Sequence, residues 1–130
     1  MTESEACEQI LGINQAVVNI GAIWVDVDVA EINPYSALIN CRTTLSQWPD
    51  LEIQFGAVFV ALLPMAWSCD MALPVLEMIT GDDAFRLNRL YQVETGFHWF
   101  LFHPKDFSSQ ASCLIAAESV SWRLVPQPST

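Results

Sequence analysis

The most constraining feature of this sequence is the segment GFHWFLFHP at residues 96–104. Successive side chains of a β-strand point to opposite faces, so a strand with one solvated face should alternate apolar and polar residues. Two largely apolar sets alternate here instead: Phe97, Trp99 and Leu101 on one face, and His98, Phe100 and Phe102 on the other. Because both faces are apolar, the fold has to cover each of them with another part of the chain or with a second molecule.

The size of the chain fits one domain with a substantial core. It has 130 residues, of which 52% are hydrophobic, and this length is typical of a single domain. We predict one domain over residues 1–124. The remaining residues 125–130, VPQPST, are predicted to form a disordered tail.

The charge of the chain excludes several classes of partner. The formal net charge is −10, because 15 acidic residues are set against only five basic ones. Nucleic-acid-binding proteins and polybasic membrane-surface proteins both need clustered cations to contact phosphates. The longest apolar run, residues 55–67, is interrupted by Pro64 and is too short to span a bilayer. We therefore expect neither nucleic acid nor a membrane as partner, and we expect another protein.

The N-terminus and the cysteines predict a cytoplasmic protein. The first ten residues, MTESEACEQI, are acidic and polar, unlike a secretory signal peptide. Four widely spaced cysteines include no C-x-x-C pair: Cys7, Cys41, Cys69 and Cys113. In a reducing compartment such cysteines act as small hydrophobic residues rather than as disulfides or metal ligands.

Local patterns predict an α+β fold. The expected elements are a helix over 3–12, strands over 23–29, 35–44 and 51–63, a helix over 71–80, strands over 84–93 and 97–103, and a helix over 108–123. Thr2 and Glu5 form a capping-box pattern before the first helix, and Gly12 is its expected stop. Residues 84–93 also suit a helix, although a strand is favoured. The order α-β-β-β-α-β-β-α predicts an antiparallel sheet of about five strands, with helices at both ends and one central helix.

Possible catalytic and metal-binding residues are sparse. Asp26 and Asp28 share a strand face, but a metal site would need further oxygen ligands. His98 and His103 are five residues apart, which places them on opposite faces of a strand. No nucleophilic side chain lies at a sequence spacing from a basic one that matches a catalytic motif. We therefore expect a protein without catalytic residues, cofactor or metal.

The chain has five tryptophans, a residue type that is enriched at protein interfaces. Most of them are expected in the core. Trp24 differs, because the alternation places it with Asp26 and Asp28, away from the neighbouring valines. An indole beside carboxylates is a candidate contact for a basic or amphipathic ligand.

The length, acidity and element order together resemble the class I chaperones of type III secretion systems, over residues from about 3 to 124. The closest part is RLNRLYQVETGFHWFLFHPKDFSSQASCLIAAESVSWRL at residues 86–124. The resemblance implies a cytosolic homodimer that holds an extended segment of an effector protein without doing chemistry. It also implies that the second helix, here ALPVLEMITGDD, pairs across the dimer axis and that a second copy covers the second apolar face of residues 96–104.

On this reading, strand addition at a sheet edge would hold the client. The expected partner-binding residues are Trp24, Val58, Phe59, Val60 and Phe100, and the expected dimer interface is formed by Leu73, Leu76 and Ile79. An alternative function is a small acidic inhibitor or immunity protein, including a phage-encoded antagonist, that blocks a toxin or nuclease. A small enzyme with a polar pocket near His98 or His103 is a further alternative.

Overall fold

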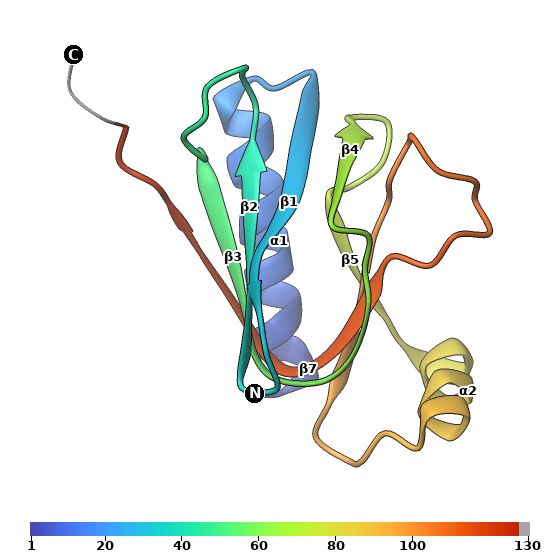
Figure 1. The fold of residues 1–130 in the computed structure, drawn as a ribbon. Helices are drawn as coiled ribbons and strands as arrows, with labels where there is room; N and C mark the ends of the chain where they lie inside the picture. The colour runs from blue at the N-terminus through green and yellow to red at the C-terminus, as the bar shows by residue number, and fades with distance from the viewer. Residues whose placement is uncertain (128–130) are drawn as a thin grey trace.

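The computed structural model describes residues 1–127, which form two helices and one seven-stranded antiparallel sheet in the order β4-β1-β2-β3-β7-β6-β5 (Figure 1). The helices are α1 (Glu3–Ile20) and α2 (Gly81–Tyr91). The strands are β1 (Trp24–Ile32), β2 (Ser36–Arg42), β3 (Leu51–Leu62), β4 (Ala66–Asp70), β5 (Leu76–Ile79), β6 (His98–Phe102) and β7 (Leu114–Leu124). The predicted α+β class and antiparallel sheet are confirmed, whereas the expected number of strands was too small.

The sheet curls strongly because β3 bends in the middle. Ala57 has a left-handed φ of 54°, and the pairing of β3 with β7 shifts register between Val58 and Val60. A β-bulge of this kind bends the strand and increases its twist. Gly56 allows the close approach of β7 at this point, since a Cβ atom there would lie 2.4 Å from Ser119 Oγ.

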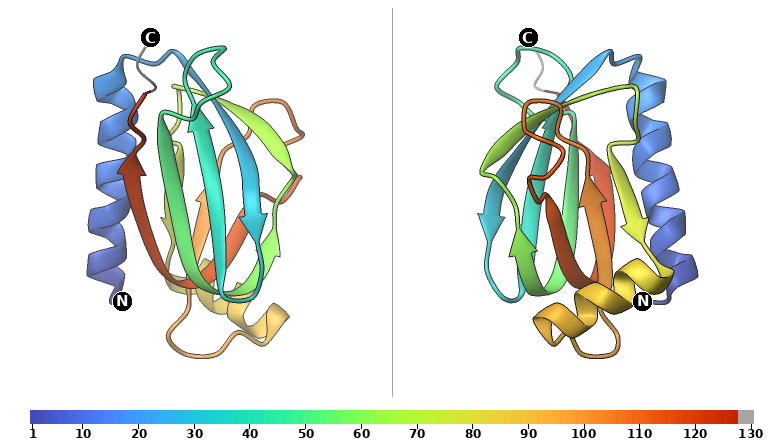
Figure 2. Two further views of the ribbon diagram at one scale, coloured as in Figure 1. Left: turned by 60° about the vertical axis from the view of Figure 1, so that its left-hand side comes forward. Right: turned by 90° about the vertical axis from the view of Figure 1, so that its right-hand side faces the viewer.

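Helix α1 packs on the concave side of the sheet, alongside β7 in one view of Figure 2 and alongside β5 in the other. Its capping box is present as predicted: Thr2 Oγ1 accepts from the Glu5 N–H at 3.1 Å, and the Glu5 carboxylate accepts from the Thr2 N–H at 3.0 Å. The predicted stop at Gly12 is wrong, and the helix ends at a left-handed Gly21. Gly12 instead allows the close approach of Trp122, because a Cβ atom at residue 12 would lie 2.8 Å from Nε1 of Trp122.

Large aromatic side chains fill the concave side of the sheet. Phe100 lies against Phe55 with ring centroids 5.1 Å apart, and Phe102 lies against Trp67 at 5.0 Å. Phe55, Phe100 and Phe102 are all almost completely buried. The core therefore covers one of the two apolar faces of residues 96–104.

Helix α2 covers part of the other face of β6, at Trp99. Trp99 is 1% exposed, and its Nε1–H donates to Oδ1 of Asn88 in α2 at 2.7 Å. The ring of Tyr91, also in α2, lies 5.8 Å from the Trp99 ring. A part of the same chain thus covers Trp99, so this strand alone does not require a second copy.

Three predicted elements were wrong in type. Residues 71–80, predicted as a helix, form a loop and β5; residues 84–93, predicted as a strand, lie mostly in α2; and residues 108–123, predicted as a helix, lie mostly in β7. Pro74 interrupts the first of these segments and disfavours a continuous helix. The second keeps half-buried side chains at helical spacing, Ala84, Leu87, Asn88 and Tyr91, on the side that faces Trp99.

The predicted disordered tail is described only in part. The N–H of Val125 donates to the carbonyl oxygen of Asp50 at 3.0 Å, and Nε2 of Gln127 donates to that of Pro49 at 3.1 Å. Residues 128–130 lie outside the described residues. No helix within residues 1–127 is long and apolar enough to cross a lipid bilayer.

Candidate binding groove between α1 and β7

The C-terminal half of β7 is an open sheet edge. β3 pairs with β7 along its whole length, whereas β6 pairs with it only from Leu114 to Ala117. Within the described residues, β3 is therefore the sole strand neighbour of residues 118–124. An edge of this kind presents a row of backbone donors and acceptors to which another strand can add.

The backbone groups on this edge point toward α1. The Val125 N–H donates to the carbonyl oxygen of Asp50 on the β3 side. Because backbone groups alternate along a strand, those of Arg123 also point to β3, and those of Trp122 and Leu124 point the opposite way. No hydrogen bond among residues 1–127 joins the backbone of 118–124 to α1.

A groove with a volume of about 450 Å³ lies between this edge and α1. We call it the α1–β7 groove, and its lining residues are Gly12, Gln15, Ala16, Asn19, Ile20, Trp122 and Leu124. None of these seven side chains is charged. Apolar side chains form most of the surface, and Gln15 and Asn19, joined by a 3.0 Å hydrogen bond, add two amides. The groove therefore combines apolar contact area with amide and backbone groups that can bind a peptide main chain.

The two outer strands of the sheet are less accessible. At β5, Asn14 acts in place of a neighbouring strand: its Nδ2 donates to the Leu76 carbonyl oxygen at 2.9 Å, and its Oδ1 accepts from the Leu76 N–H at 3.3 Å. At β4, the Ser68 N–H donates to Asp106 at 3.0 Å, and the Ser68 carbonyl oxygen accepts from Lys105 N–H at 2.9 Å. The edge of β5 also lies beside a groove against α1, with a volume of about 390 Å³, but Asn14 already binds the Leu76 backbone there. The edge of β7 lies beside an apolar groove, and within residues 1–127 no side chain of α1 is hydrogen bonded to the backbone of 118–124.

The predicted partner-binding residues do not form one site. Phe100 is completely buried and cannot contact a partner while the chain is folded, and Val58 is half-buried and packs against the core. Phe59 is 37% exposed and contacts Phe97 with ring centroids 5.1 Å apart, on a different part of the sheet from Trp24. Trp24 is half-buried on β1, opposite Asp70 of β4.

The predicted dimer helix does not exist in this fold. Leu76 is completely buried in β5 and cannot contact a second copy while the chain is folded. Leu73 is 53% exposed in the loop before β5, and Ile79 is half-buried opposite Trp99. These three residues therefore lie in three different environments rather than on one helix face.

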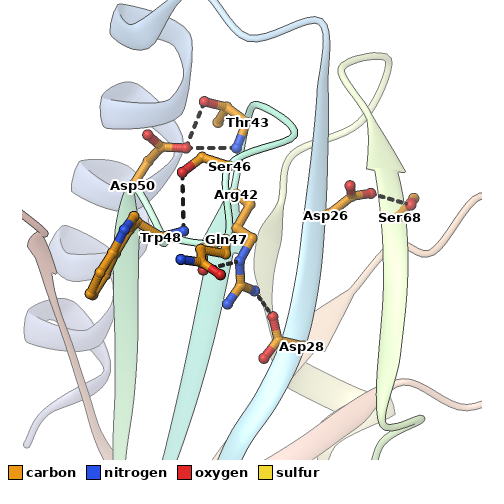
Figure 3. A network of polar contacts seen from close by, with 9 residues as sticks. All are labelled: Asp26, Asp28, Arg42, Thr43, Ser46, Gln47, Trp48, Asp50 and Ser68. Atoms are coloured by element: carbon orange, nitrogen blue, oxygen red, sulfur yellow. Dashed lines mark hydrogen bonds and ion pairs between the residues drawn. The ribbon is translucent and has the colours of Figure 1, made fainter. Parts of the chain in front are cut away.

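The paired aspartates each have a separate partner. Asp26 accepts a 2.6 Å hydrogen bond from Oγ of Ser68, and Asp28 forms an ion pair with Arg42 (Figure 3). Both side chains belong to a polar outer surface of the sheet, where cross-strand contacts of opposite charge stabilise pairing.

The two histidines also lie apart. His98 Nε2 is 2.8 Å from the carbonyl oxygen of Met1, and His103 Nε2 is 3.1 Å from a carboxylate oxygen of Glu77. Among residues 1–127, no three His, Cys, Asp or Glu side chains lie close enough together to hold a metal ion.

Three of the four thiols are buried and stay protonated at neutral pH. Burial raises the pKa of Cys69 to about 11 and that of Cys113 to about 12, and it also raises the pKa of Cys41. A thiol must ionise to act as a nucleophile. Cys41, Cys69 and Cys113 are therefore core residues here.

The groove was missed because residues 108–123 were predicted to be helical. A signal was present in the alternation of Val120, Trp122 and Leu124 with Ser121 and Arg123, which has the period of a strand. The helical spacing of Ala111, Leu114 and Ala117 nevertheless favoured a helix over a strand for this segment. Trp122 was thereby placed on a helix, and Leu124 directly after it, instead of on a sheet edge.

Comparison with known proteins gives no identification: no protein-family model matches the sequence, and no curated protein or solved structure resembles it significantly.

Proposed function

We propose that this chain is a non-enzymatic binding protein that holds an extended segment of another protein in the α1–β7 groove, in the manner of a secretion chaperone. The observation that carries the proposal is the open β7 edge beside an apolar groove. A client segment would add to residues 118–124 as a further antiparallel or parallel strand. Its alternate side chains would contact Trp122, Leu124 and the facing side of α1.

The charge of the chain supports a basic or neutral client. The net charge is −10, while the groove itself is lined by uncharged side chains. A segment with apolar residues at every second position and basic residues between them would match both features. Long-range attraction would increase its association rate, and the groove would provide the contact area.

The expected homodimer is also part of the proposal, through a surface other than a helix. The outer face of the sheet carries a row of half-buried leucines on neighbouring strands: Leu62, Leu114 and Leu101. The exposed ring of Phe59 belongs to the same part of the sheet. Apolar surface of this kind is commonly covered by a two-fold contact between copies.

An inhibitor or immunity protein that blocks a toxin or nuclease is the second candidate. Such a protein recognises a folded target instead of an extended segment. The observation that favours it is the exposed loop between β2 and β3, which displays Leu45 and Trp48 to solvent. The two candidates differ in which part of the surface they use.

The groove can be tested with a synthetic peptide of about eight residues that alternates valine and lysine, a length typical of a strand. We expect it to bind and to slow amide hydrogen exchange at Trp122 and Leu124, because strand addition pairs those backbone groups. Methylating alternate backbone nitrogens of the peptide should weaken binding at least about tenfold, since main-chain hydrogen bonds provide much of the affinity in this mode. Equal binding of the two peptides would contradict strand addition.

A pair of variants with the same charge provides the control. Leu124→Lys places a cation in the groove and should weaken binding of the peptide about tenfold, by repulsion and lost apolar contact. Leu11→Lys makes the same change at a 70% exposed position of α1 outside this groove and should bind as the unchanged protein does. If both variants weaken binding equally, the effect is one of net charge and the groove is not the site.

The homodimer predicts a mass near twice 14.5 kDa by light scattering at micromolar concentration. Leu101→Ser should shift the mass to that of one chain, because it places a hydroxyl in the row of leucines. Leu11→Ser, the same substitution on the exposed side of α1, should leave the mass unchanged. A mass of one chain for the unmodified protein would end this part of the proposal.

A further inference from the structure

The loop at residues 43–50, between β2 and β3, is held in one shape by polar contacts (Figure 3). The Asp50 carboxylate accepts from the Thr43 N–H at 2.7 Å and from its hydroxyl at 2.8 Å, which closes the base of the loop. Nε of Arg42 donates to the Gln47 carbonyl oxygen at 3.1 Å, across the middle of the loop. The loop is thus ordered by its own hydrogen bonds.

Further contacts fix the tip and the outside of the loop. Within the tip, the Trp48 N–H donates to Oγ of Ser46 at 3.1 Å, and the Ser46 N–H donates to Oγ1 of Thr44 at 3.3 Å. From outside, Nε2 of Gln127 donates to the carbonyl oxygen of Pro49 at 3.1 Å. Both ends and the tip therefore have defined partners.

This ordered loop displays two large apolar side chains. Leu45 is 95% exposed, the largest value among the exposed large hydrophobic residues described, and Trp48 is 49% exposed. Exposure of apolar side chains to water is unfavourable, and their burial in a complex would lower the free energy. A preorganised loop also loses little conformational entropy on binding, and tryptophan is enriched among residues that dominate binding energy.

The charge around the loop indicates the chemistry of the partner. Three carboxylates, those of Asp26, Asp28 and Asp50, lie in the network of Figure 3 with one guanidinium, that of Arg42. Asp28 is paired with Arg42 and Asp26 binds Ser68 on β4, so the carboxylate within the loop itself is that of Asp50, two residues after Trp48, and it adds to the net charge of −10 of the chain. A complementary surface has an apolar pocket with lysine or arginine on its rim.

We propose that the 43–50 loop is an anchor that inserts Leu45 and Trp48 into an apolar pocket, rimmed by basic residues, on a folded partner protein. This site is independent of the α1–β7 groove, because none of the groove-lining residues belongs to the loop. A partner of this kind is larger and more ordered than the extended client proposed above. The anchor rests on the second candidate function, in which the chain recognises a folded target, and it does not depend on the groove.

The test uses a photo-crosslinking amino acid, p-benzoylphenylalanine, placed at position 45 of the full chain and expressed in the native host. The control places it at position 35, where Tyr35 is 86% exposed on the turn between β1 and β2. We expect irradiation to yield one protein conjugate from position 45 that position 35 does not yield. No conjugate, or the same set of conjugates from both positions, would overturn the proposal.

The crosslinked protein is then purified and its affinity measured by calorimetry. We expect Trp48→Ala to weaken binding by about 30-fold or more, as for a residue that dominates an interface, and Tyr35→Ala to change it by less than about threefold. Raising the salt concentration should weaken binding of the unchanged chain, because the rim charges are screened. Unchanged affinity for Trp48→Ala would overturn the proposal.

A lipid surface is the other environment in which an exposed leucine and tryptophan could insert. Vesicles of neutral and of anionic lipid, added to the chain, should leave the Trp48 emission unchanged when it is compared with the Trp48→Phe variant. A blue shift of the Trp48 emission with either vesicle would show membrane insertion and would overturn the assignment to a protein partner.

Discussion

Replacing Phe100 with alanine should lower the free energy of unfolding by about 4 kcal/mol, within the range for removing a buried phenylalanine. Phe100 is completely buried, and its ring lies 5.1 Å from that of Phe55, at the centre of the concave side of the sheet. Removing the ring takes away apolar contacts and leaves a cavity that the surrounding strands can fill only in part. Urea denaturation followed by circular dichroism measures the change.

The control for this experiment is Phe85→Ala on α2. Phe85 is 62% exposed and contacts the Arg89 guanidinium at 5.8 Å, so its removal should cost no more than about 1 kcal/mol. The comparison also tests whether Phe100 contacts a partner or the core. If the isolated chain keeps its full stability in Phe100→Ala, the packing of the core described above is incorrect.

Replacing Leu76 with aspartate should unfold the chain. Leu76 is completely buried in β5, where both its N–H and its carbonyl oxygen are hydrogen bonded to the side chain of Asn14. A carboxylate there would be buried with no cation to pair it. The cost of burying an unpaired charge exceeds about 4 kcal/mol, which is close to the whole stability of a typical domain.

The matched variant is Leu73→Asp, in the loop three residues earlier. Leu73 is 53% exposed, so the same substitution should leave a folded, soluble chain. Circular dichroism and the dispersion of amide proton signals distinguish the two outcomes. A folded single chain in Leu76→Asp would instead support the earlier prediction that Leu76 lies at a dimer contact.

The first half of the chain could be predicted well because its alternation is unambiguous. Val25 and Val27 are buried while Asp26 and Asp28 are not, and the strands predicted over 35–44 and 51–63 correspond to β2 and β3. A strand with one solvated face and one buried face shows a clear hydrophobic period of two residues. The capping box at Thr2 was likewise a purely local signal, and it was confirmed.

The second half of the chain was mispredicted because the type of each element there depends on the segments that pack against it in the folded structure. Ile115, Ala116 and Ala117 are all completely buried, because one face of β7 packs on the core and, on the other, Ala116 lies beside Trp99, which α2 covers. A strand buried on both faces loses its alternation, and its alanines then suit a helix equally well. Which segment was to cover Trp99 could not be read from local sequence, so the choice between strand and helix at residues 84–93 also failed.

The candidate sites were predicted least well. Trp48 lies in the loop between β2 and β3, and its exposure depends on hydrogen bonds of Thr43 and Asp50 that no sequence pattern specifies. The open edge of β7 exists because β6 ends its pairing at Ala117 while β3 continues. Both features follow from the relative lengths and positions of elements that are distant in the chain.

The position of α1 has a consequence for how the molecule folds. Helix α1 packs against β5 and against β7, and both strands lie much later in the sequence than the helix. Its apolar face stays unprotected until those late segments arrive, and closing such a long loop is slow. During translation the chain is therefore prone to self-association until β7 has been synthesised.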